Sequence, residues 1–223
     1  MMNGKEHLKF LTNLKANNNR PWFEENKSWF KECQANFTEM VAMIIEQLAK
    51  VDPDIGLLEA KRCVFRIYRD VRFSKDKSPY KTNFGAWINR GGKQSPTAGY
   101  YFQLSPGDSF IGGGLYHPES RQLALIRQEV DYNGKELINI LNSERVSQYY
   151  PGLWDGDRLK RPPKGYDPDN EFINILKNKS FVAMHALADS EIKKDGLETR
   201  VAETMIALQP FIDYLNTAIS DEN

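Results

Sequence analysis

Residues 84–115 read FGAWINRGGKQSPTAGYYFQLSPGDSFIGGGL, and this stretch decides the fold. Its three runs that are typical of strands are Phe84–Asn89, Gly99–Leu104 and Ser109–Leu115. Gly91-Gly92 and Ser105–Asp108 separate the runs as turns. Connections this short join antiparallel neighbours, because a parallel crossover needs a dozen residues or more. The sequence therefore predicts a curved antiparallel sheet in the middle of the chain.

Three consecutive glycines, Gly112 to Gly114, lie inside the third run. Glycine within a strand marks either a bulge or the close approach of another backbone. The run is not a P-loop, because no Gly-Lys-Ser/Thr follows it. The chain also has no Gly-x-Ser-x-Gly elbow, so the common NTPase and hydrolase signatures are absent.

Helical patterns flank the predicted sheet on both sides. Leu8, Leu11 and Leu14 form the apolar face of a first helix, and a stripe from Trp22 to Leu48 predicts one long second helix packed in the core. Helices return after residue 118 and include a C-terminal helix broken at Pro210. Within that second helical part, Ser180–Leu187 is predicted as a further strand.

These patterns predict an α+β fold in one domain, residues 1–223. Residues 1–52 form its helical N-terminal part and residues 61–116 its antiparallel sheet. Residues 118–223 form a mainly helical part with a Pro-rich basic loop at 151–169. The long N-terminal helix and the C-terminal helices are expected to pack on the sheet.

The composition limits the classes of protein to which the chain can belong. It has 223 residues, of which 40% are apolar, and no apolar run reaches the ~18 residues that a membrane helix needs. The first residues lack the apolar segment of a secretory signal, and Cys33 and Cys63 are expected to be reduced and buried. We therefore expect a cytoplasmic protein without a membrane partner.

Positive charge is concentrated in one segment of an otherwise balanced chain. Thirty basic and thirty acidic residues give a net charge of zero, which argues against a protein that coats nucleic acid without specificity. Residues 61–81 hold eight basic and two acidic residues, so this segment carries +6 and the remainder −6. Such asymmetry indicates a local anionic partner.

The centre of that segment predicts an anion-binding site on a strand and the loop after it. Cys63–Arg69 is predicted to be a strand. Arg66 is expected to be partly buried in it, because the nearby apolar side chains of Phe65, Ile67 and Phe73 are expected to be buried. Guanidinium groups bind carboxylate or phosphate with two parallel hydrogen bonds. The predicted anion-binding residues here are Arg66, Arg69, Arg72, Lys77, Tyr80 and Lys81.

Two residues are candidates for proton transfer, Asp70 and His117. Asp70 and Asp76 have three open interpretations: they hold the cations in place, act as acid or base, or bind a metal. His117 follows the glycine run and precedes Pro118, so its backbone is expected to be extended. The three histidines have no metal-ligand spacing among themselves or with the cysteines, so they predict no zinc site, and no residue is assigned as a metal ligand.

The motif Arg66-x-x-Arg69-Asp70-x-Arg72-Phe73, followed by Lys77-x-x-Tyr80-Lys81, resembles the signature of an uncharacterised bacterial family, the domain of unknown function 2461. The resemblance covers nearly the whole chain, with further landmarks at residues 10–30, 114–118 and 159–166. It implies a shared fold and a shared site, and it implies no activity.

A second basic cluster lies in the 151–169 loop. Lys160 and Arg161 are the candidate anion-binding residues in it, and Pro162-Pro163 stiffens the loop there into an extended shape. If this loop folds over the sheet, the two basic clusters face one cavity. The alternative is a solvated connector, because charged loops are common.

Three functions remain open from the sequence alone. The first is a site for a small phosphorylated or carboxylated ligand, with or without catalysis; no cofactor is indicated. The second is a module for single-stranded nucleic acid, which the zero net charge makes less favoured. The third is a structural or protein-interaction role, in which the arginines and aspartates only stabilise the fold.

Overall fold

The computed structural model describes residues 2–220 and shows an α+β fold with a four-stranded antiparallel sheet. The strands are β1 (Phe84–Asn89), β2 (Gly99–Leu104), β3 (Ser109–Leu115) and β4 (Phe181–Leu187). They lie side by side in sequence order, so β4 returns from the C-terminal part to pair with β3. The bounds of β1, β2 and β3 are those predicted from the sequence, and the further strand predicted at Ser180–Leu187 is confirmed.

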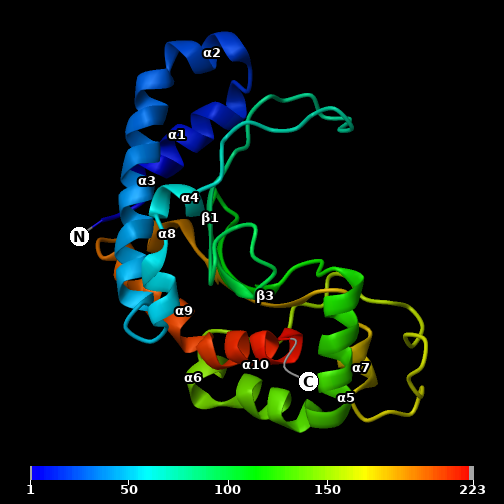
Figure 1. Ribbon diagram of the computed structural model, residues 1–223. Coiled ribbons are helices and arrows are strands. Elements are labelled where there is room, and N and C mark those ends of the chain that lie inside the picture. Colours follow the sequence, from blue (N-terminus) through cyan, green and yellow to red (C-terminus); the bar gives the residue numbers. More distant parts are fainter. Residues whose placement is uncertain (1, 221–223) are drawn as a thin grey trace.

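Helices cover one face of this sheet and leave the other open (Figure 1). Before it come α1 (Lys5–Ala16), α2 (Arg20–Glu25), α3 (Lys27–Leu48), the 3-10 turn η1 (Pro53–Leu57) and α4 (Ala60–Cys63). After β3 come α5 (Ser120–Asn142), α6 (Glu144–Ser147), α7 (Ile173–Leu176), α8 (Asp189–Ile192), α9 (Leu197–Ala207) and α10 (Gln209–Ile219). The break between α9 and α10 is the one predicted at Pro210, and among residues 2–220 no helix combines the length and apolarity that crossing a membrane requires.

One face of the sheet is buried beneath helices. Ala86, Tyr100, Phe102 and Ile111 are fully buried, and the ring of Phe37 on α3 lies 5.7 Å from that of Phe102. α9 and α10 contact β3, while α3 packs along α9. The apolar side chains of helices and sheet join in one connected core.

The glycine run predicted to be a bulge or a close approach is a close approach. The pairing of β3 with both neighbours continues through residues 112–114 without an extra residue. A Cβ atom on Gly113 would lie 2.8 Å from Leu208, and one on Gly114, whose φ is +124°, would overlap the carbonyl oxygen of Phe181. Glycine therefore lets β4 and the start of α10, with Leu208 before it, approach this strand.

The apolar stripe predicted as one long helix is divided between α2 and α3. Asn26 separates them with φ −103° and ψ 14°, and its side-chain amide donates to the carbonyl of Trp22 at 2.9 Å. An Asn side chain that bonds to the backbone in this way competes with helical bonds. The chain bends there, although both helices still turn their apolar faces inward, with Phe23 and Phe30 buried.

Cys63–Arg69, predicted as a strand, is not one. Cys63 ends α4, and the residues after it make only isolated bridges, from Val64 to Ala86 and from Tyr68 to Tyr80. An extended backbone gives the alternating pattern of a strand, but a strand also needs a row of consecutive partners. The sheet therefore begins at residue 84 and not at residue 61.

Candidate functional site

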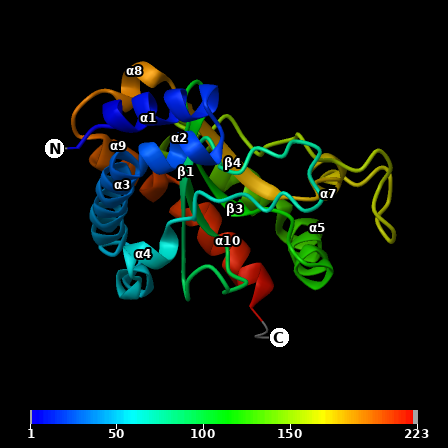
Figure 2. The ribbon, with the colours of Figure 1, turned by 90° about the horizontal axis from the view of Figure 1, so that it is seen from above.

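The basic segment forms an arm, residues 66–81, that projects from the body of the protein (Figure 1). Its two sides are joined at the base, where Arg69 N–H donates to the carbonyl of Pro79 at 2.9 Å and Lys81 N–H to that of Ile67 at 2.7 Å. Seen from above, the arm extends across the sheet toward α7 (Figure 2). It overhangs the face of the sheet that the helices leave open.

The base of the arm is anchored by Tyr80, a predicted anion-binding residue. Tyr80 is 3% exposed, and its ring stacks on Phe23 with the centroids 3.9 Å apart. The backbone N–H and carbonyl of Tyr80 both bond to the side-chain amide of Asn18. Burial raises the pKa of the Tyr80 hydroxyl. These contacts make Tyr80 a packing residue that fixes the direction of the arm.

Two of the predicted anion-binding arginines are engaged by carboxylates of the arm itself. Arg69 pairs with Asp76 and also donates to the carbonyl of Ser78. Hydrogen bonds from Ser78, together with Arg69, lower the pKa of Asp76 to about 2. Arg72 binds both carboxylate oxygens of Asp70, at 3.0 and 2.7 Å, which lowers the pKa of Asp70. These two arginines do not converge on a shared recess.

The tip of the arm is held mainly by contacts within the arm. The ammonium of Lys77 donates to the carbonyl of Val71 at 2.9 Å. Phe73, expected from the sequence to be buried, is 95% exposed, with the guanidinium of Arg72 over its ring. The expectation failed because the tip stands clear of the core and offers no apolar surface that could cover the ring.

A second group of cations lies near the point where the arm leaves the core, around the ring of Phe65. The ammonium nitrogens of Lys81 and Lys93 lie 5.3 and 4.9 Å from the ring centroid. Burial lowers the pKa of Lys81, and the charges of Arg66 and Lys93 lower it further. Burial also lowers the pKa of Lys93, which donates to the carbonyl of Val64.

Arg66 is exposed, which corrects the expectation that it is partly buried. Its backbone is in the arm, where the alternation turns Ile67 inward and Arg66 outward. Within residues 2–220, neither Arg66 nor Lys81 nor Lys93 forms an ion pair with a carboxylate. The through-space effect of Arg66 on Asp70 is the smallest of the influences on that carboxyl, whose oxygens Arg72 already occupies.

The open face of the sheet carries an aromatic pocket of about 510 Å³. Its floor includes Gly112 and Gly113 of β3, and Val182, Ala183 and Met184 of β4 form one side. Six aromatic side chains line it: Phe65, Trp87, Tyr101, Phe110, Tyr116 and Trp154. Phe65 is thus shared by the pocket and by the two ammonium groups. Lys81 itself lines a separate hollow with Arg69, and Lys93 lines another with Arg90, so the Phe65 ring is the link between the cations and the aromatic pocket.

Few polar groups line the pocket. The Tyr101 hydroxyl donates to Gln103 at 3.3 Å, and burial raises its pKa. The amide of Gln103 is already bonded to Asn83 and Asp108. Within the described part of the chain, the indole N–H groups of Trp87 and Trp154 bond to no protein atom. Both residues line the pocket, so their donors can bond to a ligand that enters it.

His117 lies beside the other end of the pocket. Its ring contacts that of Tyr116, with centroids 4.3 Å apart, and its Nε2 lies 3.5 Å from a carboxylate oxygen of Asp157. Its backbone was expected to be extended but has φ +47°, and its N–H donates to the Ser180 hydroxyl at 2.9 Å. A residue other than glycine in this region is strained, and such strain collects at functional sites.

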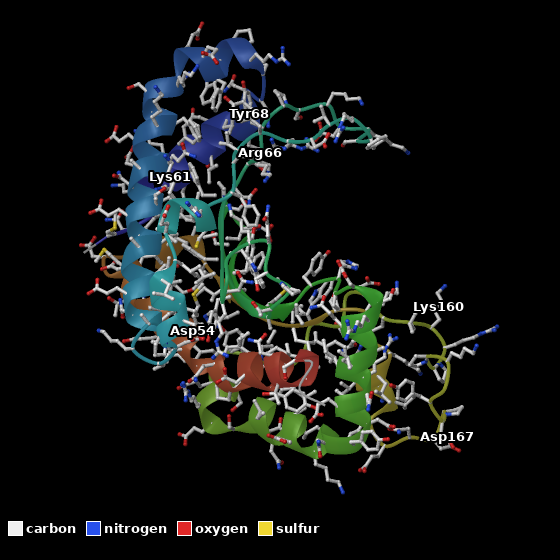
Figure 3. All side chains as sticks on the ribbon, in the orientation of Figure 1. Asp54, Lys61, Arg66, Tyr68, Lys160 and Asp167 are labelled. Atoms are coloured by element: carbon white, nitrogen blue, oxygen red, sulfur yellow. The ribbon has the colours of Figure 1, made fainter. Side chains whose placement is uncertain are left out.

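The second basic cluster lies apart from the first. Lys160 and Arg161 are exposed and line no pocket that contains Phe65 or the arm. Arg66 lies at the upper side of the opening and Lys160 on the loop at the opposite side (Figure 3). The nearby Arg158 is bonded to Asn178 at 2.7 Å. The structure does not bring the two predicted clusters together.

Several residues of the site escaped the sequence analysis. Lys93 lies in the turn after β1, Trp154 reaches the pocket from the loop after α6, and Asp157 follows it. No local spacing links them to the arm. The aromatic alternation of β1 and β2 was the available signal, since it puts Trp87 and Tyr101 on the face that the core does not use. Among the described residues, no group of three His, Cys, Asp or Glu side chains gathers where a metal could be held.

The family model described as "Conserved hypothetical protein (DUF2461)" matches residues 6–214. No curated protein and no solved structure matches the chain.

Proposed function

Because the chain belongs to the DUF2461 family of conserved hypothetical proteins, whose description assigns no activity, we propose a function from the geometry alone: it binds a small anionic ligand at the open face of its sheet. The ligand carries a phosphate or a carboxylate. Its anionic group lies beside Phe65 and its apolar part in the aromatic pocket.

One observation carries this proposal: two ammonium groups flank a single ring and neither has a carboxylate partner among residues 2–220. Both nitrogens lie about 5 Å from the centroid of Phe65, so they are separated by no more than about 10 Å. Burial lowers the pKa of both lysines, and for Lys81 the positive charges of Arg66 and Lys93 lower it further, which indicates repulsion among these cations. A bound anion would remove the repulsion and stabilise both charged forms.

Arg66 is the third member of this site. It is exposed, has no partner among the described residues and lies close enough to Lys81 to lower its pKa. A guanidinium binds phosphate or carboxylate with two hydrogen bonds, which an ammonium cannot do. We assign the anion to Arg66, Lys81 and Lys93, and we leave Arg69 and Arg72 to the internal ion pairs of the arm.

Catalysis is a separate part of the proposal. Both oxygens of Asp70 are bonded to Arg72, so Asp70 has little capacity to exchange a proton. His117 is the better candidate, because it contacts Tyr116 at the pocket and its Nδ1 has no partner among the described residues. The proposal keeps the cytoplasmic location expected from the sequence, which two unpaired cysteines fit.

Titration calorimetry with phosphate and with small carboxylates and phosphate esters tests the anion site. Replacing Lys81 by Gln or Lys93 by Gln should each weaken binding of any anion that the wild type binds by about tenfold, the loss of one charge-assisted contact of ~1.4 kcal/mol. Lys50→Gln is the matched control, because it removes the same charge from an exposed position outside the site. The proposal would be rejected if the wild-type protein bound none of the anions tested. It would also be rejected if all three variants lost the same amount of affinity.

A further inference from the structure

We infer that the ligand is a mononucleotide or a close analogue, in which a planar heteroaromatic ring is joined to a phosphate through a sugar. This ligand class rests on the proposed function, since it takes the cations beside Phe65 as the phosphate site. It adds a role for the aromatic walls and the indole donors of the pocket, which an inorganic anion or an aliphatic acid would not contact in the same way.

Glycine leaves part of the pocket floor without side chains, and this part forms a trough. Trp87, Tyr101, Gly112 and Met184 form one row across the sheet, because each is the direct partner of the next. Gly99 and Gly114 are partners in the neighbouring row. Direct partners point to the same face of a sheet, so Gly112 leaves a depression between Tyr101 and Met184. A flat ring can lie on this bare backbone.

The sides of the trough are aromatic. The rings of Tyr101 and Phe110 lie 5.4 Å apart, and those of Tyr116 and Trp154 lie 6.0 Å apart. Nucleobases stack on such side chains because every base offers a π face, and this contact depends little on which base it is. An aliphatic ligand would fill the same volume without using the flatness of these walls.

Two hydrogen-bond donors on residues that line the pocket have no protein partner among the described residues. They are the indole N–H groups of Trp87 and Trp154, in the part of the chain that the structure describes. A half-buried indole N–H normally finds an acceptor. The ring nitrogens and carbonyl oxygens at the edge of a nucleobase are such acceptors, whereas a hydrocarbon ring or chain offers none.

The length of the site matches a ligand with two separated parts. Phe65 N–H donates to Gly85 of β1, and Trp154 N–H donates to Val182 of β4, so the two residues mark opposite edges of the sheet. Both of these bonds come from backbone N–H groups. Three strand spacings separate the two edges, about 14 Å. The cations stand at the β1 edge and Trp154 at the β4 edge. A lone phosphate would occupy only the first of them.

The pocket volume favours one nucleotide over a strand. The value of about 510 Å³ lies within the roughly 300–1,000 Å³ typical of small-molecule sites. A single strand needs a groove that continues past the first base. The second basic cluster, at Lys160 and Arg161, lines no pocket continuous with this one.

Fluorescence and calorimetry with matched ligands test the inference. Two of the four tryptophans line the pocket, so a stacked base should change the intrinsic emission. The ligands are the four ribonucleoside monophosphates, ribose 5-phosphate, adenosine and inorganic phosphate. We expect at least one nucleotide to bind one-to-one, at least tenfold more tightly than ribose 5-phosphate, with a change in tryptophan emission.

The outcomes separate the two proposals. Ribose 5-phosphate binding as tightly as every nucleotide would overturn the ring site and leave the anion site standing. If none of the phosphate-bearing ligands binds, both the anion site and the ring site are rejected. If a ten-nucleotide single strand bound more than tenfold more tightly than any mononucleotide, the assignment of a mononucleotide ligand would be wrong and a single-strand site would replace it.

Substitutions in the pocket test where the heteroaromatic ring of the ligand binds. Trp154→Leu should weaken nucleotide binding at least fivefold and leave the binding of inorganic phosphate unchanged, whereas Lys81→Gln should weaken both. Tyr132→Leu is the matched control, an aromatic residue that is 75% exposed on α5 and outside the pocket. Trp87→Phe, which keeps a six-membered aromatic ring and removes the pyrrole part of the indole with its N–H, provides a second test if Trp154→Leu does not fold. Equal nucleotide affinity in wild type, Trp154→Leu and Trp87→Phe would contradict the assignment.

Discussion

The rings of Phe23 and Tyr80 stack almost in parallel, at 16° with centroids 3.9 Å apart, and this contact joins α2 to the base of the arm. Replacing Tyr80 by Ala should lower the free energy of unfolding by about 3–5 kcal/mol, because a buried aromatic ring is lost and a cavity is left. Urea denaturation measures the change.

Tyr80→Phe is the control for that variant. The Tyr80 hydroxyl has no partner among the described residues, so removing it should change the free energy of unfolding by less than about 1 kcal/mol. A loss of several kcal/mol in the Phe variant would show that the hydroxyl, and not the ring, holds the arm.

Arg69→Ala should leave the protein folded. Its partner Asp76 is 61% exposed, and an ion pair at the surface contributes about 1 kcal/mol or less to stability. The arm should loosen, which faster amide exchange at residues 69–79 would reveal. A loss of 3 kcal/mol or more in urea denaturation would instead support the interpretation of the arginines as an essential lock of the fold.

Arg90→Ala should be far more damaging than Arg69→Ala. Arg90 binds Asp52 at 2.8 Å and Asp213 at 2.9 Å, and Asp52 is only 3% exposed. Removing the guanidinium leaves a buried carboxylate without its cation, which costs about 3–5 kcal/mol. The double variant Arg90→Ala with Asp52→Asn should recover part of this loss in thermal or urea denaturation. No difference between the single and the double variant would contradict the assignment to Asp52.

The arm should loosen in acid. The pKa of Asp76 is about 2 in the folded protein, below the ordinary value of 3.8, mainly because Ser78 donates to its carboxylate. Since the folded pKa is the lower one, this stabilisation is complete above about pH 4 and is lost as the pH falls through 2. An NMR titration of the Ser78 amide should report a midpoint near 2, and Asp76→Asn should abolish it. A midpoint near 4 would show that the carboxylate is not held.

The strands could be predicted because their signals are local. Aromatic and β-branched runs with turn residues at Gly91 and Gly107 gave β1, β2 and β3 with correct bounds. The error at Cys63–Arg69 has the opposite cause: pairing with a neighbour is not local, and this segment has only isolated bridges. Buried and exposed side chains do alternate in this segment, with Ile67 buried and Arg66 exposed, but no neighbouring strand pairs with it along its length.

The candidate site was only partly accessible from the sequence. Charge density drew attention to the arm, yet it could not distinguish Arg72, which is paired within the arm, from Arg66, which is not. That distinction depends on the direction of each side chain. Lys93 and Trp154 come from separate loops at opposite edges of the sheet. Lys93 lies over the Phe65 ring and Trp154 lines the pocket, and no spacing in the sequence encodes either position.

The late return of β4 has a consequence for synthesis of the chain. Leu115 pairs with Phe181, so β3 emerges from the ribosome well before the strand that covers its outer side. During that interval β3 is an edge with unpaired backbone groups, the kind of surface that promotes aggregation. Its three consecutive glycines have low β propensity and offer no apolar side chains to a foreign strand. The glycines that admit β4 and the start of α10 in the finished fold therefore also leave few apolar side chains on this edge of the nascent chain.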